Sequence, residues 1–559
     1  MFVAAPMAHA ADPIMPLSEV QPGMRCTGLS VIKGTEISSF NVEIVDVIAP
    51  EAGLSGPRIL VRVSGPAVDE TGIGPGFSGS PVYCDGRNAG AISEGLGEYG
   101  NEVALATPIE EMIRDRPPGA LGKHRAVPGA RPRVPARARR DPALLRAARP
   151  LGTPLTVSGL TGRAAELVRE AARRAHQPLF VAPAGPVGGY QGPELRPGAS
   201  VGAAISTGDL ALGAVGTVTY RDGEDLWAFG HPFEGLGKRS LFLQDAYVYT
   251  VIQNPVGIQD FGAISYKLAS ADGNVQGAIT SDKSDAIAGR VGPGPASIPL
   301  HIVARNRAGE TVTQDSLLAD ERGLGWGAGI SFVAPLGLTQ AVGRLMRDFG
   351  PSTLRMCLRI QVRELRSPMG FCNLYFSVDD AVNDVAQAGD LVDFFDLAPL
   401  HVERIAIGAQ VRRGLKEDVI LGARAPRQAR KGSRIRVRLT LQRRRGARHG
   451  LSVPMLVPRS LKPGRLHRLT IRGGGGVFSD EALIEELVGL IDLELDGGGG
   501  GSEPRTVRQL ARRIRSLRRV PGVYARFDRR PAGLVRRSRD VSYEGRVRLR
   551  VRVTPQARR

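Results

Sequence analysis

One stretch of the 559-residue chain places a serine among glycines: residues 71–83 read Thr-Gly-Ile-Gly-Pro-Gly-Phe-Ser-Gly-Ser-Pro-Val-Tyr. Glycines let a backbone take a tight turn with positive φ, which presents a hydroxyl and leaves peptide N–H groups free. Two such N–H groups can bind the oxyanion formed when serine attacks a carbonyl, and each donor lowers the barrier by about 2.7–4 kcal/mol. The pattern therefore suits nucleophilic attack by Ser78, while a plain glycine- and serine-rich hairpin loop would have the same composition.

The spacing G-x-S-G-x-P is similar to the G-D-S-G-G-P turn of trypsin-like proteases. That resemblance implies that Ser78 is the nucleophile and that the oxyanion donors are the N–H groups of Gly76 and Ser78. Ser80 stands where the trypsin-like turn has glycine, so it is the weaker candidate.

A serine hydroxyl needs a base, and histidine is the usual one because its pKa lies near neutrality. The chain has 8 histidines. Seven lie in the N-terminal segment, the basic linker, a helix end, Arg-rich stretches or strand-like runs: His9, His124, His176, His449, His467, His301 and His401. His231 follows an apolar strand in a Gly-His-Pro turn, which would hold the imidazole beside a hydrophobic wall. The alternative is a purely structural histidine.

Taken together, the two segments resemble the sporulation stage IV B (SpoIVB) type serine peptidases, a trypsin-like group. The similarity covers short blocks at 15–35, 40–47, 60–81, 86–91 and 106–112, and a second half at 216–232 and 287–290. The resemblance implies a double β-barrel serine endopeptidase with Ser78 as nucleophile and His231 as base.

The chain departs from that family in three ways. The serine-bearing half precedes the histidine-bearing half, although a triad tolerates different chain orders. The serine turn is one residue shorter and has Phe77 where the family has methionine. The family's acidic residue lies in an I-T-D stretch whose counterpart here is Val63-Ser64-Gly65, so the acid is missing from its expected place.

The acid orients the imidazole, and its loss in a trypsin-like triad costs about 10⁴ in rate. Asp69, nine residues before the serine, and Asp245, after the histidine turn, are both candidate substitutes, and nothing in the sequence chooses between them. A Ser–His dyad without an acid is the other possibility. Asp282 and Asp285 are expected to be solvated loop residues.

The pattern of elements is mainly β. Short runs rich in β-branched residues are bounded by glycine or proline, and Asp85-Gly86 indicates a tight hairpin. Together with the family resemblance, which implies a trypsin-like double β-barrel formed by two separated segments, this pattern leads us to expect an all-β sandwich-like module and a basic tail after the barrels. The expected segments are an export-signal remnant (1–11), the serine-bearing half (12–113), a basic Pro/Ala/Arg linker (114–152), the histidine-bearing half (153–350), the sandwich-like module (351–476) and glycine-rich linkers with a basic C-terminal segment (477–559).

The formal net charge of +20 is concentrated in two places. Residues 114–150 carry +9 and residues 501–559 carry +15, so the main body is slightly acidic. These segments could bind an anionic cell-envelope polymer. Nucleic acid is a weaker expectation because interleaved aromatic residues are lacking.

The chain has 4 cysteines, which fall into two pairs without the close spacing that zinc or redox sites need. Disulfides Cys26–Cys84 and Cys357–Cys372 are expected if the protein is exported. Ala8-His9-Ala10 resembles a signal-peptidase site at the end of a shortened export signal, and an ordinary alanine-rich terminus is the alternative. The sequence contains no run of 18 apolar residues, the length that would indicate a membrane-spanning helix.

The leading hypothesis is therefore a secreted or envelope serine endopeptidase that acts on a protein substrate, without a cofactor or metal. The alternative is a catalytically silent binding or scaffold protein of the envelope that retains the peptidase fold.

Overall fold

The structure is a computed structural model of the chain. It describes residues 11–555 except 52–55, 97–100, 115–131, 152–154, 175–178, 182–191, 193, 254–264, 271–272, 347–351, 415, 445, 475–503, 519, 529 and 539. Residues 1–10 of the expected export signal, the first half of the basic linker and the glycine-rich segment up to 503 thus lie outside the described residues. Strands account for 51% of the structure, which confirms the mainly-β fold class.

Six antiparallel strands between residues 25 and 108 close into a first barrel. They are β1 (Arg25–Lys33), β2 (Glu36–Ile48), β3 (Arg58–Ser64), β4 (Pro81–Cys84), β5 (Arg87–Gly95) and β6 (Val103–Pro108). Their order is β4-β1-β2-β3-β6-β5, and β4 pairs with β5 to complete the ring. Alternation in β2 turns Phe40, Val42 and Ile44 into the core. The connection from β3 to β4 carries Ser78.

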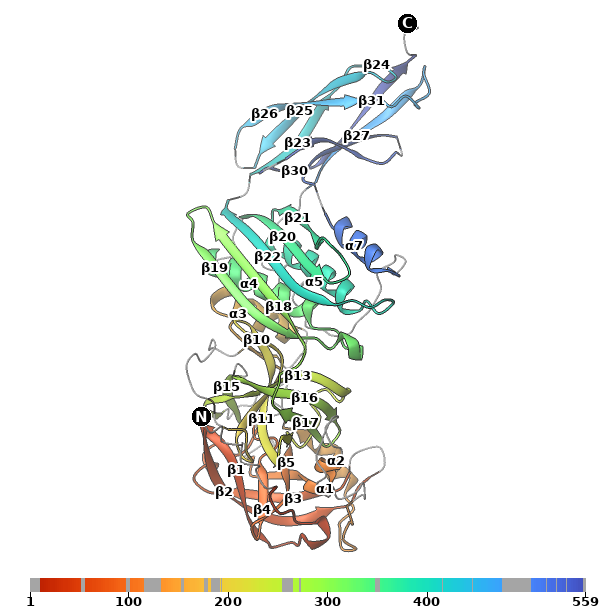
Figure 1. The fold of residues 1–559 in the computed structure, drawn as a ribbon. Helices are drawn as coiled ribbons and strands as arrows, with labels where there is room; N and C mark the ends of the chain where they lie inside the picture. The colour runs from red at the N-terminus through yellow and green to blue at the C-terminus, as the bar shows by residue number, and fades with distance from the viewer. Residues whose placement is uncertain are drawn as a thin grey trace, which may run out of the picture.

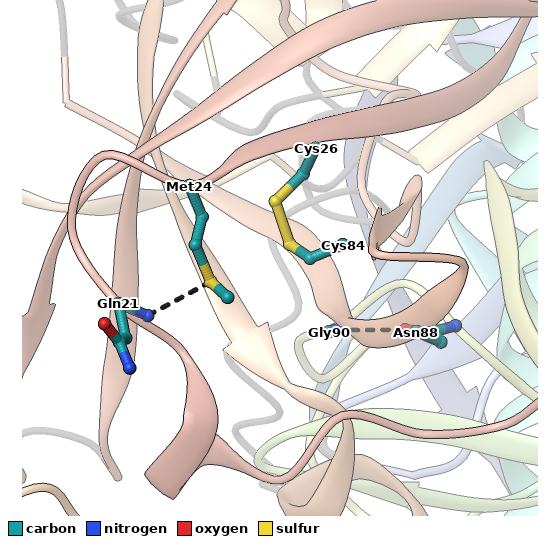
Figure 2. Close-up of a disulfide and its surroundings, with 6 residues drawn as sticks. All are labelled: Gln21, Met24, Cys26, Cys84, Asn88 and Gly90. Carbon is teal, nitrogen blue, oxygen red and sulfur yellow. Dashed lines mark hydrogen bonds between the residues drawn. A yellow bond between two sulfur atoms is a disulfide. The ribbon is translucent and has the colours of Figure 1, made fainter.

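The disulfide Cys26–Cys84 joins β1 to β4 within this barrel, and Figure 2 shows it beside the start of β5. The predicted hairpin follows directly: Asp85 (φ 50°) and Gly86 (φ 71°) both have positive φ and connect β4 to β5. This is the conformation that a two-residue type I′ turn requires, which explains the Asp-Gly pair.

A second six-stranded antiparallel barrel lies between residues 200 and 291. Its strands are β10 (Ser200–Gly208), β11 (Ala211–Asp222), β12 (Asp225–Ala228), β13 (Gly237–Asp245), β16 (Val275–Lys283) and β17 (Ala286–Val291). The order is β10-β13-β16-β17-β12-β11, closed by pairing of β10 with β11. A separate hairpin, β14 (Tyr247–Gln253) and β15 (Ser265–Ser270), interrupts the sequence of barrel strands. His231 follows β12.

The sheet of the second barrel continues into a layer of strands and helices. The strands are β18 (Ser297–Asn306), β19 (Thr311–Ala319), β20 (Ser352–Val362), β21 (Met369–Tyr375) and β22 (Val402–Arg413), with β8 (Leu155–Ser158) and β9 (Leu179–Val181) at the other end. The helices are α3 (Gly162–Arg174), α4 (Ile330–Met346), α5 (Val378–Asp393) and α7 (Val507–Ser516). These helices share one apolar core with the strands. Disulfide Cys357–Cys372 joins β20 to β21.

The C-terminal strands form two further sheets around their own core. They are β23 (Glu417–Arg424), β24 (Gln428–Arg430), β25 (Arg434–Arg443), β26 (Arg448–Leu456), β27 (Leu466–Gly474), β28 (Gly522–Phe527), β29 (Gly533–Arg537), β30 (Ser542–Glu544) and β31 (Arg546–Thr554). The strand pairing thus differs from the expected segments. Residues 352–413 belong to the preceding sheet because β22 pairs in parallel with β18. The basic tail supplies β28, β29 and β31 to one C-terminal sheet and β30 to the other.

Figure 1 shows these parts stacked along one axis, with the two barrels at one end and the C-terminal sheets at the other. The remaining short elements are η1 (Leu17–Glu19), α1 (Ile109–Ile113), α2 (Pro142–Ala147), β7 (Arg149–Pro150) and η2 (Arg322–Leu324).

Candidate functional site

The serine turn, residues 72–80, is built on glycines with positive φ: Gly72 (64°), Gly76 (97°) and Gly79 (87°). Other residues rarely adopt this backbone, so the turn explains the glycine spacing around Ser78. Ser78 is fully buried, and its Oγ has no hydrogen-bond partner among the described residues. Other buried hydroxyls of the described chain share this state, among them Ser158, Ser200 and Ser265, so Ser78 is distinguished by its place in the glycine turn rather than by the missing partner alone.

The histidine turn, residues 229–235, begins with two positive φ angles, at Phe229 (70°) and Gly230 (72°). His231 is 3% exposed, and its Nδ1 lies 2.7 Å from the carbonyl oxygen of Pro232. A carbonyl can only accept, so Nδ1 carries the proton and Nε2 keeps its lone pair. Nε2 is buried without a hydrogen-bond partner in the described part of the chain.

Burial is the largest influence on the imidazole and lowers the pKa of His231 below its ordinary value. The hydrogen bond to Pro232 and the charges of Glu94 and Asp282 act in the opposite direction, while Arg58 lowers the pKa further. The ring is therefore neutral near pH 7, as a general base must be before it takes a proton.

Strand β11 holds the two turns together. The Thr217 N–H donates to the carbonyl oxygen of Ser78 at 2.8 Å, and the Thr219 hydroxyl donates to that of Gly79 at 2.8 Å. A Cβ built on Gly79 would stand 2.5 Å from the backbone nitrogen of Phe229. The serine turn of one barrel thus packs directly against the start of the histidine turn of the other. No hydrogen bond joins Ser78 Oγ to His231 Nε2, since each lacks a partner.

The aspartates proposed from sequence lie elsewhere. The Asp69 carboxylate accepts from the N–H of Gly65 at 2.6 Å, four residues earlier, and so closes its own loop. Asp245 accepts from Asn274 and Gln276 at the end of β13. The structure does not bring either to Nδ1 of the imidazole, which already bonds the Pro232 carbonyl.

Asp282 differs from its expected role as a solvated loop residue, because it is fully buried. Its carboxylate accepts from three successive N–H groups of the histidine turn, at 2.7, 2.8 and 2.8 Å: Phe233, Glu234 and Gly235. Arg239 balances the charge at 3.4 Å. Asp282 therefore positions the loop that holds His231. Asp285 is also buried, beside Arg58 at 3.3 Å.

Of the two proposed oxyanion donors, the Gly76 N–H points at the carbonyl oxygen of Leu151 at 3.4 Å. Ser78 lies two residues further along the same turn. The donor is thus directed at a peptide carbonyl, the group that an oxyanion hole has to receive.

Lys267, on β15, is a buried group that the sequence reasoning missed. Its Nζ donates to Ser30 Oγ at 2.7 Å and lies 4.6 Å from the centre of the Phe77 ring. Ser80 Oγ lies 2.9 Å from Ser30 Oγ and donates to the Phe77 carbonyl oxygen at 2.6 Å. Burial lowers the pKa of Lys267 to about 7. The only signal in the sequence was a lysine between Tyr266 and Leu268 in a short strand-like run, in a chain with few lysines.

Two closed six-stranded antiparallel barrels, with the serine turn on one and the histidine turn on the other, define a double β-barrel consistent with the trypsin-like fold. Comparison of the chain with protein-family models, curated proteins and solved structures found no match. The two disulfides favour an extracytoplasmic location. Among the described residues, no helix has the length and apolarity needed to cross a bilayer, and no cluster of ligating side chains is arranged for a metal ion.

Proposed function

We propose that the chain is an exported serine endopeptidase, similar to the SpoIVB peptidases, that cuts a protein substrate by acyl transfer. The observation that carries the proposal is the meeting of the two turns. A buried serine hydroxyl and a buried neutral imidazole nitrogen, both without partners, lie in turns of two barrels that pack against each other. A nucleophile and its base must come within hydrogen-bond reach of each other, so the mechanism requires Ser78 Oγ and His231 Nε2, which are not bonded in this structure, to close that distance when a substrate binds.

In this mechanism Ser78 Oγ attacks the peptide carbonyl carbon and its proton passes to Nε2 of His231. The N–H groups of Gly76 and Ser78 donate hydrogen bonds to the developing oxyanion. The C–N bond then breaks, and the imidazolium protonates the leaving amine. Water enters, gives its proton to Nε2, and hydrolyses the acyl-serine.

The Pro232 carbonyl would take the orienting role that a carboxylate has in the trypsin-like triad. It holds the same tautomer, since it accepts from Nδ1–H. A neutral dipole stabilises the imidazolium less than a full negative charge does. We therefore expect slow turnover.

A fluorophosphonate probe, which acylates activated serines, tests the proposal on the purified, disulfide-bonded chain. Labelling should vanish in Ser78→Ala and fall at least 100-fold in His231→Ala. Ser18→Ala, at an exposed serine, is the matched control and should label like the parent chain. Because Ser78 Oγ makes no hydrogen bond, Ser78→Ala should keep the unfolding free energy within about 0.5 kcal/mol.

The second candidate is an envelope binding protein that retains the fold without turnover. It is favoured by the burial of Ser78 and His231 and by the lack of an acid on Nδ1. A folded chain with both disulfides that takes up no probe would favour this candidate and would remove the peptidase.

The C-terminal sheets support a separate proposal for the basic tail, namely binding of an anionic envelope polymer. Alternation in β31 exposes four arginines on one face of that strand: Arg546, Arg548, Arg550 and Arg552. Retention on an immobilised polyanion should fall in a variant with all four changed to glutamine, and salt should weaken it in the parent chain.

A further inference from the structure

The outer face of the C-terminal sheet β24-β31-β27-β28-β29 carries a hollow lined by arginines. On the central strand β27, Thr470 stands opposite Arg526 of β28. Two residues along, Arg472 stands opposite Arg546 of β31. Side chains two residues apart on a strand point to the same face, so a short side chain is surrounded by long basic ones. This arginine hollow has a volume of about 340 Å³ and is lined by Thr470, Arg472, Tyr524, Arg526, Ala532 and Arg546.

The positive charge of the hollow is not balanced within the described part of the chain. Among those residues, no carboxylate lies within 4.0 Å of any of the three arginines. The acids two residues away from two of them are engaged elsewhere, since Asp528 pairs with His467 and Glu544 pairs with Arg444. Two of the arginines also stand directly opposite each other on β27 and β31, and like charges so placed are destabilising. A bound anion would relieve this repulsion.

The donors of the hollow suit a phosphate group. Guanidinium groups donate in pairs to phosphate oxygens, and here they come from three neighbouring strands. Thr470, which is 6% exposed, adds a hydroxyl at the floor. The guanidinium of Arg472 lies 5.7 Å from the centre of the Tyr524 ring, a contact that holds this side chain without neutralising its charge. Because a carboxylate accepts in one plane whereas phosphate oxygens point in several directions, donors from three strands favour phosphate.

We propose that the arginine hollow binds a phosphate group of an anionic envelope polymer, held between its three arginines and the Thr470 hydroxyl. The inference deepens the proposal for the basic tail and does not depend on the peptidase. A polymer seated in the hollow meets further guanidinium groups along β31 at intervals of about 6.8 Å, as far as Arg552. The hollow supplies the preference for phosphate, whereas the rest of β31 supplies charge.

Calorimetric titration of the purified, disulfide-bonded chain with long-chain inorganic polyphosphate tests the inference. Changing Arg472→Gln and Arg526→Gln together should weaken binding at least tenfold. The matched control changes two exposed arginines of β25 in the other C-terminal sheet, Arg434→Gln and Arg436→Gln, and should stay within threefold of the parent. Thr470→Leu, which fills the floor without changing the charge, should weaken binding at least fivefold. An equal loss in the β25 control would show that net charge alone attracts the polymer, and would overturn the inference.

Urea unfolding checks that the double variant is folded and that the charges of the hollow repel. Because Arg472 lies opposite another arginine, the chain with Arg472→Gln and Arg526→Gln should unfold at a urea concentration no lower than that of the parent. A lower midpoint would contradict the unbalanced charge on which the inference rests.

Three other probes identify the ligand. Polyglutamate of equal charge should bind at least tenfold more weakly than polyphosphate, and equal binding would overturn the preference for phosphate. Inorganic phosphate alone should bind at least 100-fold more weakly, and equal affinity would make the ligand a small anion rather than a polymer. A single-stranded oligonucleotide of equal charge that bound tenfold more tightly would replace the envelope polymer by nucleic acid. If changing all four β31 arginines abolishes polyphosphate binding while the double variant of the hollow keeps it, the hollow is wrong and the basic-tail proposal stands.

Discussion

Removing the charge of Asp282 should loosen the histidine turn and slow reaction at Ser78. Its buried carboxylate accepts three N–H groups within 2.8 Å and pairs with Arg239. A hydrogen bond to a charged group contributes about 1.5–3 kcal/mol, and the three bonds are not additive. In Asp282→Asn the amide oxygen still accepts a hydrogen bond, but the NH₂ group, itself a donor, faces backbone N–H groups that need an acceptor. We expect the unfolding free energy to fall by about 3 kcal/mol.

Glu321→Gln is the matched control for this experiment. Glu321 is also buried and also pairs with Arg239, at 2.8 Å, but its other bond is to the N–H of Ser240, outside the histidine turn. Both variants should be less stable in urea, whereas only Asp282→Asn should slow fluorophosphonate labelling, by about tenfold. The reasoning is refuted if Asp282→Asn unfolds within about 0.5 kcal/mol of the parent, or if both variants slow labelling equally.

Three further outcomes follow from the geometry. Gly79→Ala should lower the free energy of unfolding by more than about 3 kcal/mol, because its Cβ would stand 2.0 Å from a carbonyl oxygen of β11. Gly86→Ala, with comparable φ and open space, should lower it by about 1 kcal/mol. Urea unfolding compares the two variants, and equal losses of unfolding free energy would contradict the clash at Gly79. Removing the disulfide with Cys26→Ser and Cys84→Ser should lower the free energy of unfolding by about 4 kcal/mol, because the bond closes a loop with a sequence separation of 58 residues. A loss of unfolding free energy under about 1 kcal/mol in thermal unfolding would contradict this expectation. Burial lowers the pKa of Lys267 to about 7. The unfolded chain therefore binds more protons than the folded chain between pH 7 and 10.5, and the free energy of unfolding should rise with pH through that range, by about 2 kcal/mol from pH 7 to 9 relative to Lys267→Met. Parallel curves of unfolding free energy against pH for the two chains would contradict this expectation.

The strands of the two barrels and the two turns could be predicted because their signals are local, whereas the closure of the strands into two barrels was expected only from the family resemblance. Positive φ at Gly76 and Gly79 needs glycine, and the Asp85-Gly86 hairpin needs two residues tolerant of that region. Strand alternation was equally visible in β20 and β22, but it does not say which sheet a strand joins. Their pairing with β18, and the cover of α4 and α5, depend on contacts distant in sequence.

The hydrogen-bond partner of His231 Nδ1 could not be predicted from side chains, because it is a backbone carbonyl. Every peptide unit carries one, so Pro232 left no mark in the residue pattern. Asp282 was misjudged for a related reason: its three donors are backbone N–H groups brought to it by the pairing of β13 with β16. The docking of Arg149–Leu151 on β5 likewise depends on main-chain hydrogen bonds rather than on a motif.

The serine-bearing barrel is complete by residue 108, whereas the histidine turn belongs to a ring that closes only at residue 291. Because synthesis proceeds from the N-terminus, the barrel that carries Ser78 can fold before the ring that carries His231 is complete. Under the proposed function, a nascent chain in that interval holds Ser78 without His231 and does not yet cleave peptides. The order of the two halves in the chain thus delays the assembly of the Ser78 and His231 turns until the second ring is complete. A circular permutation that reversed the order would keep this delay, but the histidine-bearing ring would then fold first.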